Sequence, residues 1–344
     1  METMTKTKPA LLNELETEKA IAGLKQKFAG VLSKKLNLIK VEAPLIVEKG
    51  TGINDDLNGV ERPVKVNVKE LPGTAVEIVH SLAKWKRARL AKLGMKPGEG
   101  LYTDMKALRP DEDFSDSHSI YVDQWDWEKV ILQSNRSLAY LEKIVRNIYS
   151  AILETESFVA MSNPKLKQFL PKEITFIHTE ELQRKYPDLS PKQRENEIAR
   201  SKGAVFIIGI GGVLGDGQPH DGRAPDYDDW ITQTERGTKG LNGDIVVWNP
   251  VLKRGFEISS MGIRVSAESL RKQLTVNGQE KRLELRWHKQ LLSGELPYTI
   301  GGGIGQSRLA MLLLQKKHIG EVQSSVWPKE VIESLTEQEI LILS

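Results

Sequence analysis

A glycine-rich stretch near the C-terminus ends in an arginine and continues into an apolar segment. Four of the residues 301–305 are glycine, Arg308 follows, and residues 309–314 are all apolar. Glycine lets a backbone approach a ligand closely, arginine presents a fork of donors that suits phosphate, and a helix N-terminus attracts anions. The stretch therefore indicates a nucleotide phosphate site, with a glycine-rich turn before a core helix as the alternative.

Two further patterns contain groups that bind nucleotides. Arg109 stands three residues before Glu112, so the arginine can hold an α-phosphate while the acid orients an adenine amine, unless both form a charged turn. Asp244 and Glu257 lie on two expected neighbouring strands, where converging carboxylates can hold Mg²⁺ against a triphosphate. Carboxylates on strands are rarely buried unless paired or metal-bound, and two exposed strand acids are the alternative.

Charged clusters that suit an amino acid occur in two other places. The segment 226–229 is a dense acidic loop, which can hold an ammonium group or can simply be solvated. Lys84, Lys86 and Arg87 follow Ser81 and can either bind a carboxylate or form a helix surface. Taken separately, these clusters leave the ligand open.

Several other chemistries are excluded. The chain has no cysteine, which rules out thiol nucleophiles, disulfides and Cys-ligated zinc. The six histidines lack a metal-binding spacing. Residues 209–215 carry Leu214 where a dinucleotide fingerprint needs glycine, and no P-loop motif is present.

The composition is that of an ordinary globular protein. The 344 residues suffice for one large or two medium domains, and a net charge of +3 gives no argument for nucleic-acid binding. No apolar run approaches the ~18 residues of a membrane helix, and the first residues lack the apolar core of a signal peptide. We therefore expect a cytoplasmic enzyme that has no membrane segment.

Hydrophobic periodicity predicts the elements that must position these groups. Residues 10–36 repeat apolar positions at helical spacing, whereas 38–46 alternate like a strand that Pro44 confines to an edge. Further strands are expected at 64–68, 76–79, 119–128, 205–208, 245–248 and 255–259, helices at 80–93 and 280–292, and a mostly helical block at 134–200. Because turns separate the strands more often than crossover helices do, the pattern predicts an α+β domain.

Taken together, these segments resemble the catalytic domain of class II aminoacyl-tRNA synthetases, in the order in which that family has them. Residues 38–46 are similar to its first motif, 109–112 to its second and 303–308 to its third. Three segments are similar to the aspartyl branch, namely 81–86, 124–128 and 257–264. The resemblance implies a mostly antiparallel sheet flanked by helices.

The chain resembles the ammonia-dependent asparagine synthetase (aspartate–ammonia ligase) family more closely. Only a helix is expected before the first motif, which leaves no room for the anticodon-binding barrel of the tRNA ligases. Segments similar to that family's own signatures are 80–87, 98–103, 121–128 and 223–230. We expect an N-terminal extension over 1–17 and a single catalytic domain over 18–344, with a mostly helical insertion at about 131–200.

The resemblance implies a two-step reaction of L-aspartate, ATP and ammonia. ATP activates the β-carboxylate as β-aspartyl-adenylate, releasing pyrophosphate, and ammonia then gives L-asparagine and AMP. Mg²⁺ is expected, tRNA is not, and the first motif implies a homodimer. Because positioning and charge stabilisation carry such chemistry, no nucleophilic side chain is needed.

The resemblance also implies roles for individual residues. Arg109 is expected to neutralise the α-phosphate and Arg308 the γ-phosphate end of a bent ATP. The implied ATP-binding residues are Arg109, Glu112, Ser119, Asp244, Glu257, Gly303, Gly305 and Arg308, with Asp244 and Glu257 as metal ligands. The implied substrate-binding residues are Asp55, Ser81, Lys86, Gln124, Asp126, Asp228, Ser260 and Arg264.

Because the β-carboxylate must react, we hypothesise that aspartate lies turned round relative to its pose in the tRNA ligases. Lys86 and Arg264 then hold the α-carboxylate, and Asp55, Gln124 and Asp126 hold the α-ammonium group.

Ammonium must also be bound and deprotonated, for which Asp228 and Asp55 are the candidates. The expected catalytic residues are Arg109, Arg308, Asp228 and Asp55. Without a glutaminase domain or an N-terminal cysteine, glutamine is not expected to donate nitrogen.

Two alternatives stay open. The first is a truncated asparaginyl- or aspartyl-tRNA ligase paralogue that adenylates the α-carboxylate, against which the missing barrel argues. The second is a catalytically inactive synthetase-like regulator, for which loss of Arg109, Arg308 or Glu257 would be the sign; all three are present.

Overall fold

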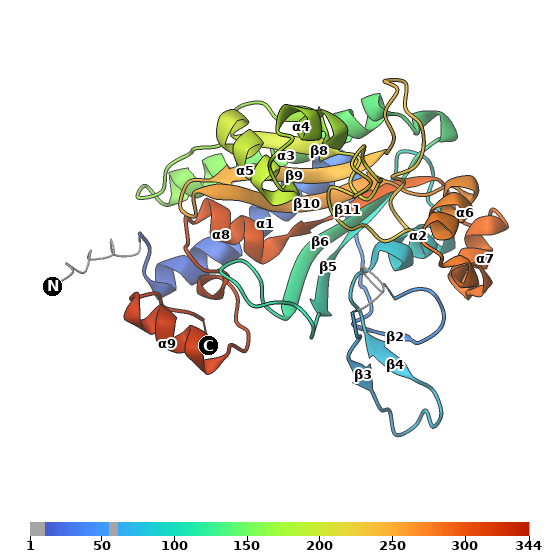
Figure 1. Ribbon diagram of the computed structural model, residues 1–344. Helices are drawn as coiled ribbons and strands as arrows, with labels where there is room; N and C mark the ends of the chain where they lie inside the picture. Colours follow the sequence, from blue (N-terminus) through green and yellow to red (C-terminus); the bar gives the residue numbers. More distant parts are fainter. Residues whose placement is uncertain (1–10, 55–60, 344) are drawn as a thin grey trace.

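The computed structural model describes residues 11–54 and 61–343, and its centre is an eight-stranded sheet (Figure 1). In spatial order the strands are β1 (Leu38–Lys40), β5 (Gly100–Leu108), β6 (Tyr121–Val130), β11 (Thr299–Gly305), β10 (Arg254–Ile263), β9 (Asn242–Asn249), β8 (Ala204–Ile208) and β7 (Thr175–His178). The pairings from β5 to β8 are antiparallel, while β1 and β7 join the two edges in parallel. The predicted α+β domain with a mostly antiparallel sheet is confirmed in outline.

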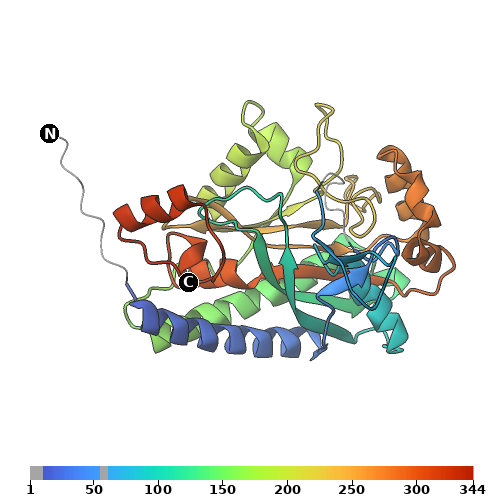
Figure 2. The same cartoon turned by 90° about the horizontal axis from the view of Figure 1, so that it is seen from below.

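Helices α1 (Glu14–Leu36), α3 (Leu138–Ser162) and α8 (Gln306–Leu313) share the main core with the sheet, and α1 and α3 lie side by side (Figure 2). The first helix begins at Glu14 because Asn13 caps it in a reciprocal box with Glu16. Its buried stripe contacts the sheet, with the rings of Phe28 and Trp125 4.5 Å apart. The helix expected over 10–36 is thus confirmed from Glu14 onward.

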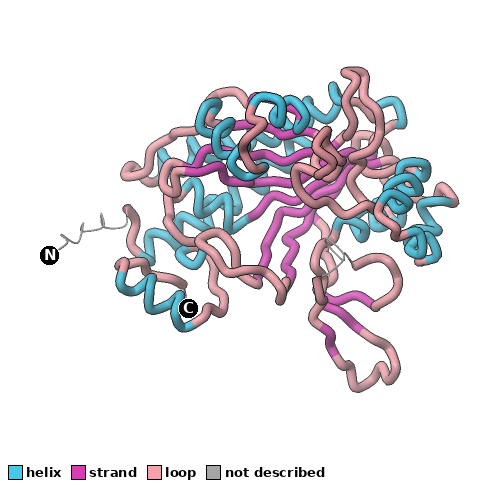
Figure 3. The backbone as a smooth tube through the Cα atoms, viewed as in Figure 1, coloured by secondary structure: helices cyan, strands magenta, loops and turns pink. Residues whose placement is uncertain are grey.

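Smaller groups of elements surround this core. Helices α4 (Thr179–Lys185) and α5 (Pro191–Lys202) pack against β7, β8 and β9. Next to α2 (Ala83–Lys92), a third core joins α6 (Ala267–Val276), α7 (Arg286–Leu292) and the 3₁₀ turn η2 (Glu280–Glu284). A small sheet of β2 (Ile46–Glu48), β4 (Val76–Ile78) and β3 (Lys65–Val66) projects from the main body (Figure 3). The short elements η1 (Gln133–Asn135), η3 (Ile319–Glu321) and α9 (Lys329–Glu337) complete the described chain.

The glycine-rich stretch is strand β11, not a turn. A side chain at Gly301 would overlap Glu128, and one at Gly303 would overlap Gln124, both on the neighbouring strand β6. Glycine is required here because the side chains of β6 cross the face of β11. The alternative of a glycine-rich turn is therefore wrong, because the stretch is a central strand that runs directly into α8.

Other differences lie at the ends and edges of the sheet. The segment expected as one strand over 38–46 is divided between β1 and β2, which belong to different sheets. Strands β5 and β7 and helix α6 were not predicted, and β7 lies inside the block expected to be mostly helical. The expected domain boundary after residue 17 falls within α1, and the division into an extension, a domain and an insertion stays a prediction. No helix in the described part of the chain is long and apolar enough to cross a membrane.

Candidate active site

Two adjoining pockets lie over strands β6, β10 and β11. The larger has a volume of about 390 Å³ and the smaller one of about 200 Å³. The residues that line both pockets are Arg109, Glu112, Gln124, Glu257, Ser260 and Gly303. Segments far apart in the sequence therefore meet over one patch of the sheet.

The structure brings most of the predicted site residues to these pockets. Those of the predicted substrate-binding set that line the larger pocket are Ser81, Lys86, Gln124, Asp126, Asp228, Ser260 and Arg264. Ser119, Gly305 and Arg308 line the smaller pocket. Asp55 lies outside the described residues. Asp244 lines neither pocket, but it is bound to Arg223, which lines the larger one.

A buried charge cluster lies deep in the larger pocket. The Nζ of Lys86 forms an ion pair with Asp126 and lies 3.2 Å from the carbonyl oxygen of Gly302 and 3.9 Å from Glu128. Arg264 donates to both carboxylate oxygens of Glu128 at 2.8 and 3.1 Å. Burial lowers the pKa of Lys86 and raises that of Asp126, whereas Arg264 and Lys86 outweigh burial at Glu128 and lower its pKa. The cluster therefore offers fixed charges of both signs to a zwitterion.

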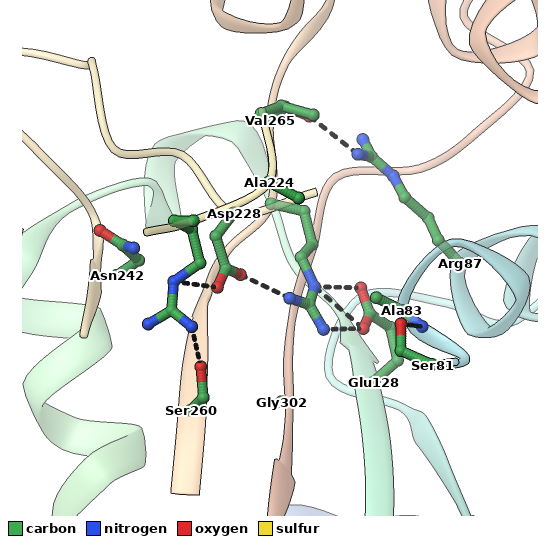
Figure 4. Close-up of polar contacts among 12 residues, drawn as sticks. Ser81, Ala83, Arg87, Glu128, Ala224, Asp228, Asn242, Ser260, Val265 and Gly302 are labelled. Atoms are coloured by element: carbon green, nitrogen blue, oxygen red, sulfur yellow. Dashed lines mark hydrogen bonds and ion pairs between the residues drawn. The ribbon is translucent and has the colours of Figure 1, made fainter. Parts of the chain in front are cut away.

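Arg223 connects this cluster to Asp244 on strand β9. Figure 4 shows Asp228 between Ser260 and Glu128, with dashed contacts that run from its carboxylate to either side. Its Nε lies 3.6 Å from Asp228, and its terminal nitrogens bind Ser260 and Asp244. The other oxygen of Asp228 accepts from Arg264. Burial opposes the charge on Arg223, but the two carboxylates raise its pKa. Arg223 was not among the site residues predicted from the sequence, although it is the first residue of the motif-like segment 223–230.

Of the three carboxylates in the acidic loop, only Asp228 lines a pocket. Asp229 is buried and pairs with Arg136. Asp226 is buried and is bound at 2.9 to 3.0 Å by Lys84, Arg282 and His288. Two members of the loop therefore anchor it to neighbouring elements, and the third is presented to a ligand.

In the smaller pocket, Arg308 is held at two points. Its Nη1 donates to the carbonyl oxygen of Glu257 at 3.1 Å and lies 3.5 Å from that residue's carboxylate. Its Nη2 binds Nε2 of His118. Burial, together with Arg308, lowers the pKa of His118 to about 4, so the neutral ring can accept a hydrogen bond from the guanidinium. His118 was also missed from the sequence, because nothing in its spacing distinguished it.

Arg109 stands where the pockets meet. Its guanidinium donates to the carbonyl oxygen of His80 at 3.4 Å and lies 3.9 Å from Glu112. Its Nε is buried and makes no hydrogen bond to any described residue. A buried arginine N–H that has no hydrogen-bond partner among the described residues is suited to donate to a ligand oxygen.

Asp244 and Glu257 lie on the adjacent strands β9 and β10. Burial raises the pKa of Asp244 to about 7, opposed by Arg223 and reinforced by Glu257. Mg²⁺ in phosphate-transfer sites takes one or two carboxylates and otherwise phosphate oxygens and water. Among the described residues no group of three or more side chains could hold a metal ion. Two carboxylates on neighbouring strands match the number of protein ligands that a phosphate-bound Mg²⁺ takes.

Solved structures share the fold. An asparaginyl-tRNA synthetase from Entamoeba histolytica in complex with asparaginyl-adenylate has a TM-score of 0.64 at 15% identity, over 90% of this chain and 66% of that chain. The asparaginyl-tRNA synthetase from Pyrococcus horikoshii complexed with asparaginyl-adenylate gives 0.67 at 14% identity, over 91% and 70%. An aspartyl-tRNA synthetase from Entamoeba histolytica gives 0.59 at 14% identity, over 89% and 58%. This chain thus has the class II synthetase catalytic fold and spans 58 to 70% of the length of these three chains.

The family comparison is more specific. Residues 15–339 match the family described as aspartate-ammonia ligase. The match includes both pockets and all three motif-like segments. The protein is therefore a ligase and belongs to the aspartate–ammonia ligase family.

Proposed function

We propose that this enzyme makes L-asparagine from L-aspartate, ammonia and ATP through a β-aspartyl-adenylate, releasing pyrophosphate and AMP. The observation that carries the proposal is the arrangement of two joined pockets. One contains the buried cluster of positive and negative charges. Arg109 lines both pockets, and its Nε makes no hydrogen bond to the part of the chain that the structure describes. Family membership supports aspartate and ammonia as the substrates. Two structurally similar synthetases were solved in complex with asparaginyl-adenylate, which supports an adenylate as the intermediate.

The charge cluster suggests how aspartate is oriented. Lys86 and Arg264 hold the α-carboxylate deep in the larger pocket, while Asp126 and Gln124 hold the α-ammonium group. The β-carboxylate then points towards Arg109, the cation shared with the smaller pocket. This pose leaves the α-carboxylate too far inside to react.

ATP occupies the smaller pocket in the proposal, with Arg308 at its phosphates. A Mg²⁺ held by Glu257 and Asp244 would neutralise phosphate charge. Arg223 has a separate task, because it keeps Asp244 and Ser260 aligned beside the reacting groups.

In the first step, a β-carboxylate oxygen attacks the α-phosphorus and the bond to pyrophosphate breaks. Arg109 neutralises the charge that develops on the α-phosphate. In the second step, ammonia attacks the acyl carbon and AMP leaves with the carboxyl oxygen. The proton lost by ammonium passes to Asp228 or Asp55, and Asp228 must release one of its two arginines to accept it.

We also infer a homodimer, on the strength of the resemblance in the first motif. That the enzyme is cytoplasmic and does not use tRNA are separate proposals, which rest on the composition and on the resemblance to the aspartate–ammonia ligases. Sedimentation at several protein concentrations tests the dimer, since a monomer at micromolar concentration contradicts it.

One assay tests the proposed reaction directly. Purified enzyme is incubated with aspartate, ATP and ammonium, and asparagine, AMP and pyrophosphate are quantified. Glutamine replaces ammonium in one control, and tRNA is added in another. Equal amounts of asparagine and AMP with ammonium alone support the proposal, whereas ADP formation or charged tRNA contradicts it.

A further inference from the structure

The smaller pocket receives side chains from the segment that follows α8. Ile319 and Gln323 line it together with Ser119 and Arg308. Gln323 is only 4% exposed, so its amide is buried in the pocket wall. No motif-like segment of the sequence contains it, and neither the family match nor the proposed reaction gives it a role.

Gln323 joins two walls of the pocket. Its Oε1 accepts from the hydroxyl of Ser119 at 2.6 Å, and its Nε2 donates to the hydroxyl of Ser307 at 3.1 Å. Ser119 lies just before β6, and Ser307 is in the first turn of α8, directly before Arg308. One carboxamide therefore links the start of a strand to the helix that carries the phosphate-binding arginine.

The first turn of α8 has a second attachment to the same strand. The backbone N–H of Ser307 donates to Asp123 at 3.0 Å. The hydrogen bonds from Gln323 and to Asp123 both hold Ser307. The next residue is Arg308, whose guanidinium contacts Glu257 and His118. The position of Arg308 consequently depends on how Ser307 is held.

The segment that carries Gln323 is itself anchored. The backbone N–H of Ile319 donates to the carbonyl oxygen of Asp116 at 2.7 Å. The ring of Trp327 lies 5.6 Å from Phe114 and 4.8 Å from His318. The amide is thus held in place by protein contacts alone, as a preorganised support must be.

We propose that Gln323 is a positioning residue of the nucleotide pocket, which sets the spacing between Ser119 and Ser307 and so places Arg308 towards ATP. The inference rests on the proposed function in that the ligand is ATP. A glutamine suits this task because its amide offers an acceptor and a donor at once. It acts through the two serines and needs no contact with the nucleotide.

The test uses Gln323→Met, which keeps the side-chain length and volume but removes both hydrogen bonds. Gln290→Met is the matched control, because that half-buried side chain on α7 lines neither pocket and its amide donates to Glu295 at 3.4 Å. Two lost hydrogen bonds predict about a tenfold rise in the KM and the calorimetric Kd for ATP. The KM for aspartate stays within about twofold, because Gln323 does not line the larger pocket.

A second variant tests the route of the effect. Ser307→Ala is combined with Gln323→Met, and the ATP Kd is measured for both single variants and the double variant. Because the residues act as one unit, the second substitution adds less than about twofold. Independent, multiplying effects overturn the inference.

The inference also fails if Gln323→Met leaves the ATP Kd unchanged. It fails as well if the variant raises the KM values for ATP and aspartate equally, because that result would indicate a general loss of structure in the site. The binding measurement separates this result from the proposed function. If the enzyme binds ATP but forms no asparagine, the proposed reaction fails while the effect of Gln323 is still measured. If the enzyme binds no ATP, both fail.

Discussion

Replacing Lys86 by methionine tests the proposed orientation of aspartate. Lys86 is wholly buried, pairs with Asp126 and lines the larger pocket but not the smaller one. Methionine fills a similar volume and removes only the ammonium group. The variant therefore separates aspartate binding from ATP binding.

Lys86→Met should weaken aspartate binding and lower the folding stability. A charge-assisted hydrogen bond to the α-carboxylate is worth about 1.5–3 kcal/mol, which corresponds to a rise of roughly 10- to 150-fold in the KM for aspartate. The KM for ATP should change by less than about twofold. Because Asp126 loses its buried partner, the variant also loses about 3–5 kcal/mol of folding stability.

Steady-state kinetics in both substrates and urea unfolding measure these effects. Adding Asp126→Asn should restore much of the stability, since no unpaired carboxylate is then buried, while aspartate binding stays weak. A double variant that regains stability and aspartate affinity together would show that Lys86 is structural. Equal rises in the two KM values for Lys86→Met would refute the proposed pose.

Three other predictions concern separate parts of the site. Asp228→Asn should still form adenylate, seen as aspartate-dependent exchange of pyrophosphate into ATP, but should lower asparagine formation at least about tenfold; normal asparagine synthesis would remove Asp228 as the ammonium base. Asp244→Asn and Glu257→Gln should each raise the Mg²⁺ concentration for half-maximal rate about tenfold, and an unchanged Mg²⁺ requirement would exclude the pair as ligands. Because the pKa of His118 falls from 6.5 to about 4 on folding, the unfolded chain binds more protons between these values. Acidification from about pH 7.5 to about pH 5 should thus cost the wild type about 2 kcal/mol more stability than His118→Asn; equal losses in urea titrations would contradict this.

Local chemistry explains what the sequence by itself determined. Helical spacing predicts α1, and alternation predicts β6. The motif-like segments carry Arg109, Arg308 and Glu257, whose types already suit a nucleotide. These features depend on residues close together in the chain, so they can be predicted without knowledge of the tertiary structure.

The missed strands show where such patterns fail. Strand β5 is buried continuously over residues 100–103 and alternates between buried and exposed positions only from Asp104 onward, so its periodicity is weak over the whole strand. Strand β7 is four residues long and lies between helices. Its strand conformation depends on pairing with β8, which is distant along the chain.

Only the tertiary structure decided which charged groups face the ligand. Asp226, Asp228 and Asp229 look alike in the sequence, but two of them bind structural partners and one reaches the pocket. Arg223 and Gln323 acquire their roles from partners on separate strands and helices. The physical reason is that burial and hydrogen-bond partners arise from long-range packing, whereas the sequence shows only residue type and local spacing.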